Sequence, residues 1–225
     1  MTKEQIICGD AVAGLLELQS ECVDLIVTDP PYLVDYKDRT GRKVANDNSP
    51  DAVLPAFAEM YRVLKDDSLC ISFVGWTALD KFTRTWVEAG FRIVGHIIWT
   101  KDYASSTGQT AYHHESAYVL AKGWPRRPET PFADVQPWVY SGNRWHPTEK
   151  SVENIGAVIR AFSKRDDTVL DPFLGSGTTA VAAALNGRSA IGIELERRYC
   201  DLAQRRVAGD KRYLATKDQS ASKAA

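Results

Sequence analysis

Hydrophobic residues along the chain follow two patterns, short apolar runs and segments with a helical repeat. Runs rich in β-branched residues predict buried strands at 5–8, 23–27, 68–74, 91–99, 115–121, 168–170 and 189–193. Between them, apolar residues recur every three or four positions, which predicts helices at 12–18, 51–65, 79–89, 151–162, 179–185 and 196–207. Because strands alternate with helices, we expect one mostly parallel α/β sheet, without a repeat or a domain linker.

Three stretches lack a hydrophobic repeat. Residues 33–50 are polar and charged, and a loop of this length is usually functional, so we expect a mobile loop that binds the target. Residues 101–145, apart from the strand predicted at 115–121, are rich in Ser, Thr, Gly and Pro and offer room for only a short target-recognition region. The tail at 215–225 lacks apolar anchors and is expected to be disordered, which leaves a single domain at 1–214.

Composition narrows the class of protein without identifying it. The chain has 225 residues and a net charge of −1, which neither favours nor excludes nucleic acid. No apolar stretch approaches the ~18 residues of a membrane span, so we expect a cytoplasmic protein with no membrane partner. The four cysteines are scattered, and His113 and His114 lack a third ligand at a sensible spacing, so no metal site is predicted.

The segment 23–32 places a carboxylate and an aromatic ring at the end of a buried strand. Its apolar run ends in Asp29, Pro30, Pro31 and Tyr32. The prolines fix φ and cannot continue a ladder, and such turns at the carboxyl ends of strands are where open α/β sheets bind ligands. Asp29 and the neighbouring backbone carbonyl could accept both hydrogens of an amino group on a flat ring stacked on Tyr32. A solvated Asp in a strand-ending turn is the alternative for so short a motif.

A glycine-rich turn follows the strand predicted at 168–170. It leads into a predicted helix and has the sequence Asp171-Pro172-Phe173-Leu174-Gly175-Ser176-Gly177-Thr178-Thr179. Gly175 and Gly177 permit the close backbone approach that a nucleotide-like ligand requires at a helix N-terminus. A Walker A loop is excluded because no lysine follows, and the missing third glycine weakens a dinucleotide-binding interpretation. Glu194 ends the next strand about 20 residues on, where a carboxylate can hold ribose hydroxyls.

Together the two motifs resemble those of the amino-group DNA methyltransferases, which modify adenine N6 or cytosine N4. Residues 29–32 are similar to their Asp-Pro-Pro-Tyr signature, and residues 171–177 to their Asp-Pro-Phe-x-Gly-x-Gly cofactor motif. The resemblance extends from residue 9 to about residue 199, in the permuted motif order of the β class. It implies a circularly permuted, Rossmann-like α/β methyltransferase fold with a seven-stranded, mostly parallel sheet and helices on both faces. Strands one and two would then be 168–170 and 189–193, and the five segments from 5–8 to 115–121 would be strands three to seven.

The resemblance also implies roles for individual residues. Asp29 and the carbonyl of Pro30 accept the target amino group, Pro31 completes the motif and Tyr32 is the stacking ring. The implied S-adenosylmethionine site consists of Asp10 at adenine, Glu194 at ribose, and Asp171, Phe173, Gly175, Gly177, Thr178, Thr148 and Lys150. The last two lie near the methionine carboxylate in a segment similar to the family's His-Pro-Thr-x-Lys, His146-Pro147-Thr148-Glu149-Lys150. Ser151 replaces the family's proline, so the start of the following helix is expected to differ.

The resemblance implies methyl transfer to adenine N6 of a flipped base in double-stranded DNA, by a bacterial or phage-encoded enzyme. Cytosine N4, an RNA amine and a DNA-binding pseudoenzyme are the alternatives. Adenine is favoured over cytosine because Ser more often replaces the Asp in the cytosine enzymes. The short recognition region indicates a short site, a homodimer, or both.

Other residues are assigned by type. Trp99 resembles the segment that flanks the flipped-base pocket, with a structural aromatic as the alternative. The arginine pairs 197–198 and 205–206 are expected on the solvated face of the last helix. Candidates for DNA phosphate contacts are Lys37, Arg39, Arg42, Lys43, Arg126 and Arg127.

Overall fold

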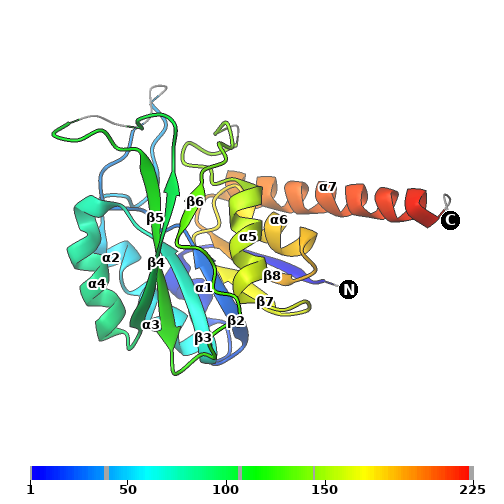
Figure 1. The fold of residues 1–225 in the computed structure, drawn as a ribbon, viewed down its shortest axis with the longest axis horizontal. Coiled ribbons are helices and arrows are strands. Elements are labelled where there is room, and N and C mark those ends of the chain that lie inside the picture. Colours follow the sequence, from blue (N-terminus) through cyan, green and yellow to red (C-terminus); the bar gives the residue numbers. More distant parts are fainter. Residues whose placement is uncertain (1, 38–40, 106–107, 144, 223–225) are drawn as a thin grey trace.

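The computed structural model describes residues 2–37, 41–105, 108–143 and 145–222, and its strands form one eight-stranded sheet (Figure 1). The spatial order is β1-β8-β7-β2-β3-β5-β4-β6, and β5 alone among these strands runs antiparallel to its neighbours. The predicted mostly parallel α/β sheet is therefore confirmed. The strands are β1 (Glu4–Cys8), β2 (Val23–Thr28), β3 (Leu64–Phe73), β4 (Arg92–Thr100), β5 (His114–Lys122), β6 (Val135–Pro137), β7 (Thr168–Asp171) and β8 (Ser189–Glu194).

The sheet has one strand more than the seven predicted. The additional strand, β6, pairs in parallel with β4 from Ile98↔Val135 to Thr100↔Pro137 and forms one edge of the sheet. A three-residue strand is too short to show a hydrophobic repeat, and the surrounding prolines indicated irregular structure. Pro137 is tolerated because proline can occupy an edge strand.

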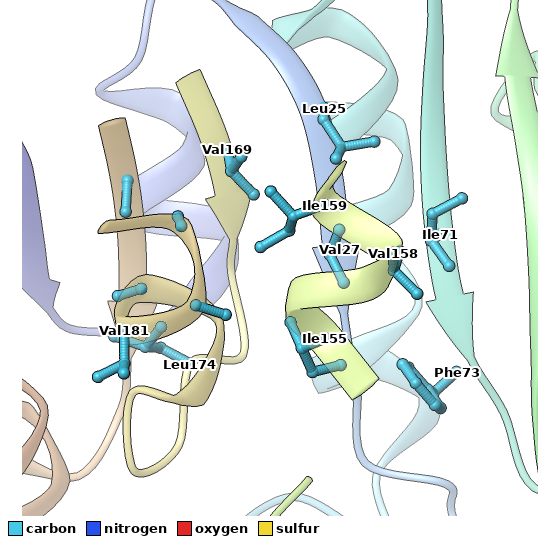
Figure 2. Packing of buried hydrophobic residues seen from close by; sticks show 14 of the residues in the cluster. Leu25, Val27, Ile71, Phe73, Ile155, Val158, Ile159, Val169, Leu174 and Val181 are labelled. Atoms are coloured by element: carbon cyan, nitrogen blue, oxygen red, sulfur yellow. The ribbon is translucent and has the colours of Figure 1, made fainter. Parts of the chain in front are cut away.

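Helices cover both faces of the sheet. One layer consists of α1 (Ala11–Leu16), α2 (Pro50–Val53), α3 (Ala56–Val63) and α4 (Leu79–Glu88), the last preceded by the 3-10 helix η1 (Trp76–Ala78). The other layer consists of α5 (Val152–Phe162), α6 (Thr178–Leu185) and α7 (Arg197–Ser222). In Figure 2, Ile155, Val158 and Ile159 of α5 lie against Leu25 and Val27 of β2. The central strands are thus buried on both faces, which explains their continuous apolar runs.

The last helix, α7, is longer than expected and continues to Ser222. It therefore includes most of the tail at 215–225 that was predicted to be disordered, while residues 223–225 lie outside the described residues. Figure 1 shows its C-terminal half extending away from the sheet. The tail lacks apolar anchors, but its Ala, Lys and Gln residues have good helix propensity and can prolong a helix that packing has already started.

The strand order reverses between β7 and β2. From β7 the chain passes through α6 to β8 on one side, and from β2 through α2 and α3 to β3 on the other. Open α/β sheets bind ligands at the carboxyl ends of the strands at such a point, and both sequence motifs follow these two strands. None of the helices in the described ranges is both long and apolar enough to span a lipid bilayer.

Candidate active site

The two motifs meet at the point where the strand order reverses. The Thr28 hydroxyl at the end of β2 donates to Oδ1 of Asp171 at the end of β7, over 3.0 Å. Asp171 Oδ2 accepts from the Thr179 hydroxyl at 2.7 Å, and Oδ1 also accepts from the Phe173 N–H at 3.1 Å. Burial raises the pKa of Asp171 to about 7, although these hydrogen bonds act in the opposite direction. Asp171, predicted as a cofactor residue, thus lies at the cavity, and its carboxylate joins the two motifs.

One cavity collects the predicted site residues. Every residue assigned to catalysis or cofactor binding lines it except Gly177. The segments that line it include the start of α1, the end of β2, the glycine turn, the end of β8, the region 146–150 and part of the loop 33–50. Residues far apart in the sequence are therefore brought together as the motifs predict.

In the turn 29–32, which was predicted to be catalytic, both oxygens of Asp29 accept hydrogen bonds. The Tyr32 hydroxyl donates to Oδ1 at 2.6 Å, and the Lys150 ammonium donates to Oδ2 at 2.5 Å. The Tyr32 ring packs against Gly75, where a Cβ atom would come within 2.9 Å of ring carbon Cδ2. Asp29 is thus fixed on both sides, and the orientation of the Tyr32 ring is set by its hydroxyl and by Gly75.

Lys150 forms a mostly buried ion pair with Asp29. Its side chain is 10% exposed, against 21% for Asp29. Burial lowers the pKa of Lys150, but the negative charges of Asp29 and Glu115 outweigh burial, so that the pKa is raised overall. The resemblance places Lys150 near a methionine carboxylate, whereas its partner in this structure is the carboxylate of Asp29.

The glycine turn is linked to the acid at the end of β8. Gly175 and Gly177 have φ values of 55° and 91°, the left-handed region that favours glycine, and α6 begins directly after Gly177. The Gly175 N–H donates to Glu194 Oε2 at 2.8 Å, and the Glu196 N–H donates to Oε1 at 2.7 Å. Each carboxylate oxygen has a second lone pair, so Glu194 can still accept from the hydroxyls of a ligand.

The hydroxyl of Thr178 supports a polar ligand in this cavity. Its Oγ1 is buried and has no hydrogen-bond partner within the described part of the chain. Because an unpaired buried hydroxyl is unfavourable, a polar ligand group beside it would complete its bonding. At the far end of the cavity Asp10 caps α1, accepting from the N–H groups of Val12 and Ala13 through Oδ1. Hydroxyl, carboxylates and a glycine turn at a helix N-terminus together fit a nucleoside with an amino-acid tail.

The segment 146–150 closes another side of the cavity. Burial, together with the positive charges of Lys150, Arg198 and Arg42, lowers the pKa of His146 to about 4, so the imidazole is neutral near pH 7. Its Nδ1 accepts from the Thr148 N–H at 3.3 Å. Ser151, where the family has proline, caps α5 by accepting from the Asn154 N–H at 3.0 Å. The serine therefore starts the helix through its side chain.

The loop at 33–50 folds back over the cavity in its described part. Asp47, 3% exposed, accepts from the N–H groups of Leu33 at 2.9 Å and Tyr36 at 2.7 Å. Lys37 and Lys43 face each other across an antiparallel bridge. Arg39, one of the predicted phosphate contacts, lies outside the described residues. Sequence reasoning assigned no role to Asp47, because its partners are backbone groups that only the folded loop presents.

Part of the predicted target-recognition region lies next to the catalytic turn. Lys101, with a side chain 3% exposed, pairs with Glu115, and the Lys101 Nζ is 5.4 to 5.7 Å from the ring centroids of Tyr103, Tyr112 and Trp138. Burial and the negative charges of Asp29 and Glu115 raise the pKa of Tyr32, so the phenol keeps its proton. Tyr103, Tyr112 and Trp138 were not singled out in the sequence, because aromatic residues in irregular segments show no hydrophobic periodicity.

Other residues with a predicted role do not line the cavity. Trp99 is 1% exposed and stacks on Phe73 with ring centroids 4.9 Å apart. It is therefore a structural aromatic residue of the core, the alternative to a role beside the flipped base. The segment that carries Arg126 and Arg127 starts at the opposite end of the sheet, where Trp124 lies over Arg92 at the start of β4. Nowhere in the described ranges do three or more His, Cys, Asp or Glu side chains gather in a group that could hold a metal ion.

Comparisons with known proteins identify the family. The sequence profile of the family N6_N4_Mtase, described as DNA methylase, matches residues 23–205. YubD of Escherichia coli (strain K12), a protein named as a methylase, is 48% identical over 210 residues, which cover 93% of this chain and 92% of that protein. The DNA adenine methyltransferase YhdJ of the same organism is 31% identical over 251 residues, with coverages of 93% and 84%.

A solved structure shows the same fold with the cofactor bound. TTHA0409 from Thermus thermophilus, in complex with S-adenosyl-L-methionine, superposes with a TM-score of 0.72 at 25% identity and covers 93% of this chain and 96% of its own. S-adenosylmethionine is therefore the cofactor of the family that shares this fold. With its fold, its cavity and its matched motifs in agreement, the chain belongs to the DNA methylase family whose members modify adenine N6 or cytosine N4.

Proposed function

We propose that this chain methylates the N6 amino group of adenine in double-stranded DNA. The observation that carries the proposal is the position of Asp29. Asp29 directly follows β2, and its carboxylate accepts from the Tyr32 hydroxyl and lines the same cavity as the glycine turn and Glu194. A carboxylate held there can orient an amino group toward a cofactor bound across the β7 side of the cavity.

The cofactor supplies a methyl group on a sulfonium, which is an excellent leaving group. The protein's contribution is then alignment of the amine for in-line displacement. Asp29 and the Pro30 carbonyl accept the two amine hydrogens, which pushes electron density back onto the nitrogen. Tyr32 and Lys150 need not leave, because each oxygen of a carboxylate can accept two hydrogen bonds. Their contacts instead hold the carboxylate in one orientation.

Adenine is the proposed base for two reasons. The motif begins with Asp29, where cytosine enzymes of the family more often have serine. YhdJ, a relative named as a DNA adenine methyltransferase, is 31% identical across most of this chain. An amine inside a duplex cannot reach a carboxylate at the end of a buried strand, so the base must be rotated out of the stack.

Contacts to DNA phosphates are proposed for the loop that covers the cavity. Lys37 and Lys43 lie in its described part, and Arg39 and Arg42 neighbour them in the sequence. Arg126 and Arg127 are less suitable because their segment starts at the other end of the sheet. A homodimer remains part of the proposal because the recognition region is short, and sedimentation velocity of the chain with and without DNA measures it.

The test is transfer of a tritiated methyl group from S-adenosylmethionine to unmethylated genomic DNA, followed by nucleoside digestion and mass spectrometry. We expect label in N6-methyladenine, lost in Asp29→Ala and kept in Asp35→Ala, an exposed acid of the neighbouring loop. Label in N4-methylcytosine would overturn the choice of base. No label in DNA, together with label in a parallel reaction that contains RNA, would overturn the DNA substrate. Cofactor binding without any transfer would favour the pseudoenzyme.

A further inference from the structure

Arg206 of α7 contacts two separate parts of the cofactor cavity. Its Nη1 donates to the backbone oxygen of Ser176 at 2.8 Å and to the Ser176 hydroxyl at 2.7 Å. The same nitrogen lies 3.1 Å from Oε1 of Glu149. The side chains of Arg206 and Glu149 are 14% and 4% exposed. The prediction that Arg206 lies on the solvated face of the last helix is therefore wrong. The same prediction holds for Arg197 and Arg198, whose side chains are exposed.

The contact with Ser176 fixes the shape of the glycine turn. The peptide group between Ser176 and Gly177 is held at both ends, because its oxygen accepts from Arg206 and its N–H donates to the Leu174 oxygen at 3.0 Å. The same helix also presses on Gly177, where a Cβ atom would lie 2.7 Å from the Cβ of Ala203. Arg206 thus acts where α7 already touches the turn.

The contact with Glu149 extends this arrangement to the catalytic side. Oε2 of Glu149 accepts from the Trp145 N–H at 3.2 Å, and the Ser141 hydroxyl donates to the Glu149 backbone oxygen at 2.7 Å. Lys150, the next residue, pairs with Asp29. A single guanidinium therefore ties the cofactor turn to the segment that holds the catalytic carboxylate.

We propose that Arg206 is a positioning residue for S-adenosylmethionine. It keeps the glycine turn in the conformation that receives the cofactor, and it acts through Ser176 and Glu149. This role requires no contact between Arg206 and the target base. The proposal rests on the cofactor of the family and not on whether adenine or cytosine is methylated. Hydrogen bonds to charged groups are strong enough that their loss should weaken cofactor binding by about tenfold to a hundredfold.

Isothermal titration of the full chain with S-adenosylmethionine tests the proposal. We expect Arg206→Ala to raise the Kd by at least about tenfold, and Arg206→Lys to restore part of it because the charge is kept. Arg205→Ala is the matched control, since that exposed neighbour donates to the Asp201 oxygen of its own helix and should leave the Kd unchanged. In methyl-transfer assays, KM for the cofactor should rise while kcat at saturating cofactor and KM for DNA stay within about twofold of wild type.

A second variant covers the case in which Arg206→Ala does not fold. Glu149→Gln keeps the shape of the side chain but removes the charge that holds Arg206, so it should raise the Kd severalfold in a folded protein. Wild-type Kd values in both Glu149→Gln and Arg206→Lys, or a rise in Arg205→Ala equal to that in Arg206→Ala, would overturn the proposal. Failure of the wild-type chain to bind the cofactor would instead overturn the cofactor site itself.

Discussion

Replacing Asp171 with asparagine should change the free energy of unfolding in a pH-dependent way. Asp171 is 3% exposed, and burial raises its pKa from the ordinary 3.8 to about 7. Well below pH 3.8 the carboxyl is protonated in both the folded and the unfolded chain. As the pH rises toward 7, the unfolded chain releases the proton while the folded protein keeps it, so folding becomes less favourable.

The size of the effect follows from the two pKa values. A group that titrates near 3.8 unfolded and near 7 folded destabilises the protein by about 2 kcal/mol at pH 5 and by about 4 kcal/mol at pH 8. The variant D171N has no ionisable group at this position. The difference in unfolding free energy between D171N and wild type should therefore shift in favour of D171N by about 2 to 3 kcal/mol between pH 5 and pH 8. The altered hydrogen bonds to Thr28 and Thr179 add a cost that is the same at both pH values and does not affect this shift.

Urea unfolding followed by circular dichroism at the two pH values and equal ionic strength measures this difference. Histidines and other carboxyl groups are shared by both proteins and cancel in the comparison. Asp166→Asn is the control, because it makes the same substitution at an exposed position. A difference between D171N and wild type that is the same at both pH values would refute the assignment of a raised pKa to Asp171.

Two further substitutions test the packing around the site. Trp99→Ala should lower the free energy of unfolding by about 3 to 5 kcal/mol, because the ring is buried against Phe73. Trp124→Ala is the control, and because its ring is 78% exposed it should lower the free energy of unfolding by less than about 1 kcal/mol. Equal effects in chemical denaturation would contradict the core position of Trp99. Gly177→Ala adds a clash with Ala203 to an unfavourable φ, while Gly142→Ala, at φ 84° with no atom near its Cβ position, carries the φ cost alone. The first should therefore destabilise by about 1 to 3 kcal/mol more than the second, and identical denaturation midpoints would show that α7 does not press on the turn.

Local patterns account for the elements that were predicted well. The strands β2 and β7 are short, apolar and followed by prolines that cannot extend a ladder, so each could be located from its own sequence. The helix predicted at 51–65 shows where local reasoning stops. Its hydrophobic repeat is genuine, but Pro55 divides it into α2 and α3, since proline at that point cannot donate to the preceding turn.

Side-chain partners were harder to predict because they depend on contacts between distant segments. No sequence spacing connects Lys150 with Asp29, or Arg206 with Glu149. A signal for Arg206 did exist, since Tyr199 and Ala203 are buried at intervals that place Arg206 on the same helical stripe. Charged residues are expected on the surface, and that expectation outweighed the periodicity.

The arrangement of the site follows from the permuted topology. In the chain the catalytic turn comes near the start and the cofactor turn near the end, yet β2 and β7 are neighbours in the sheet, and Thr28 and Asp171 join the two turns directly. Asp29 then receives Lys150 from the segment that precedes α5, a helix whose apolar side chains pack on the same strands. Because these contacts join the carboxylate proposed for the amine to the turn proposed for the cofactor, the sheet itself sets their relative position.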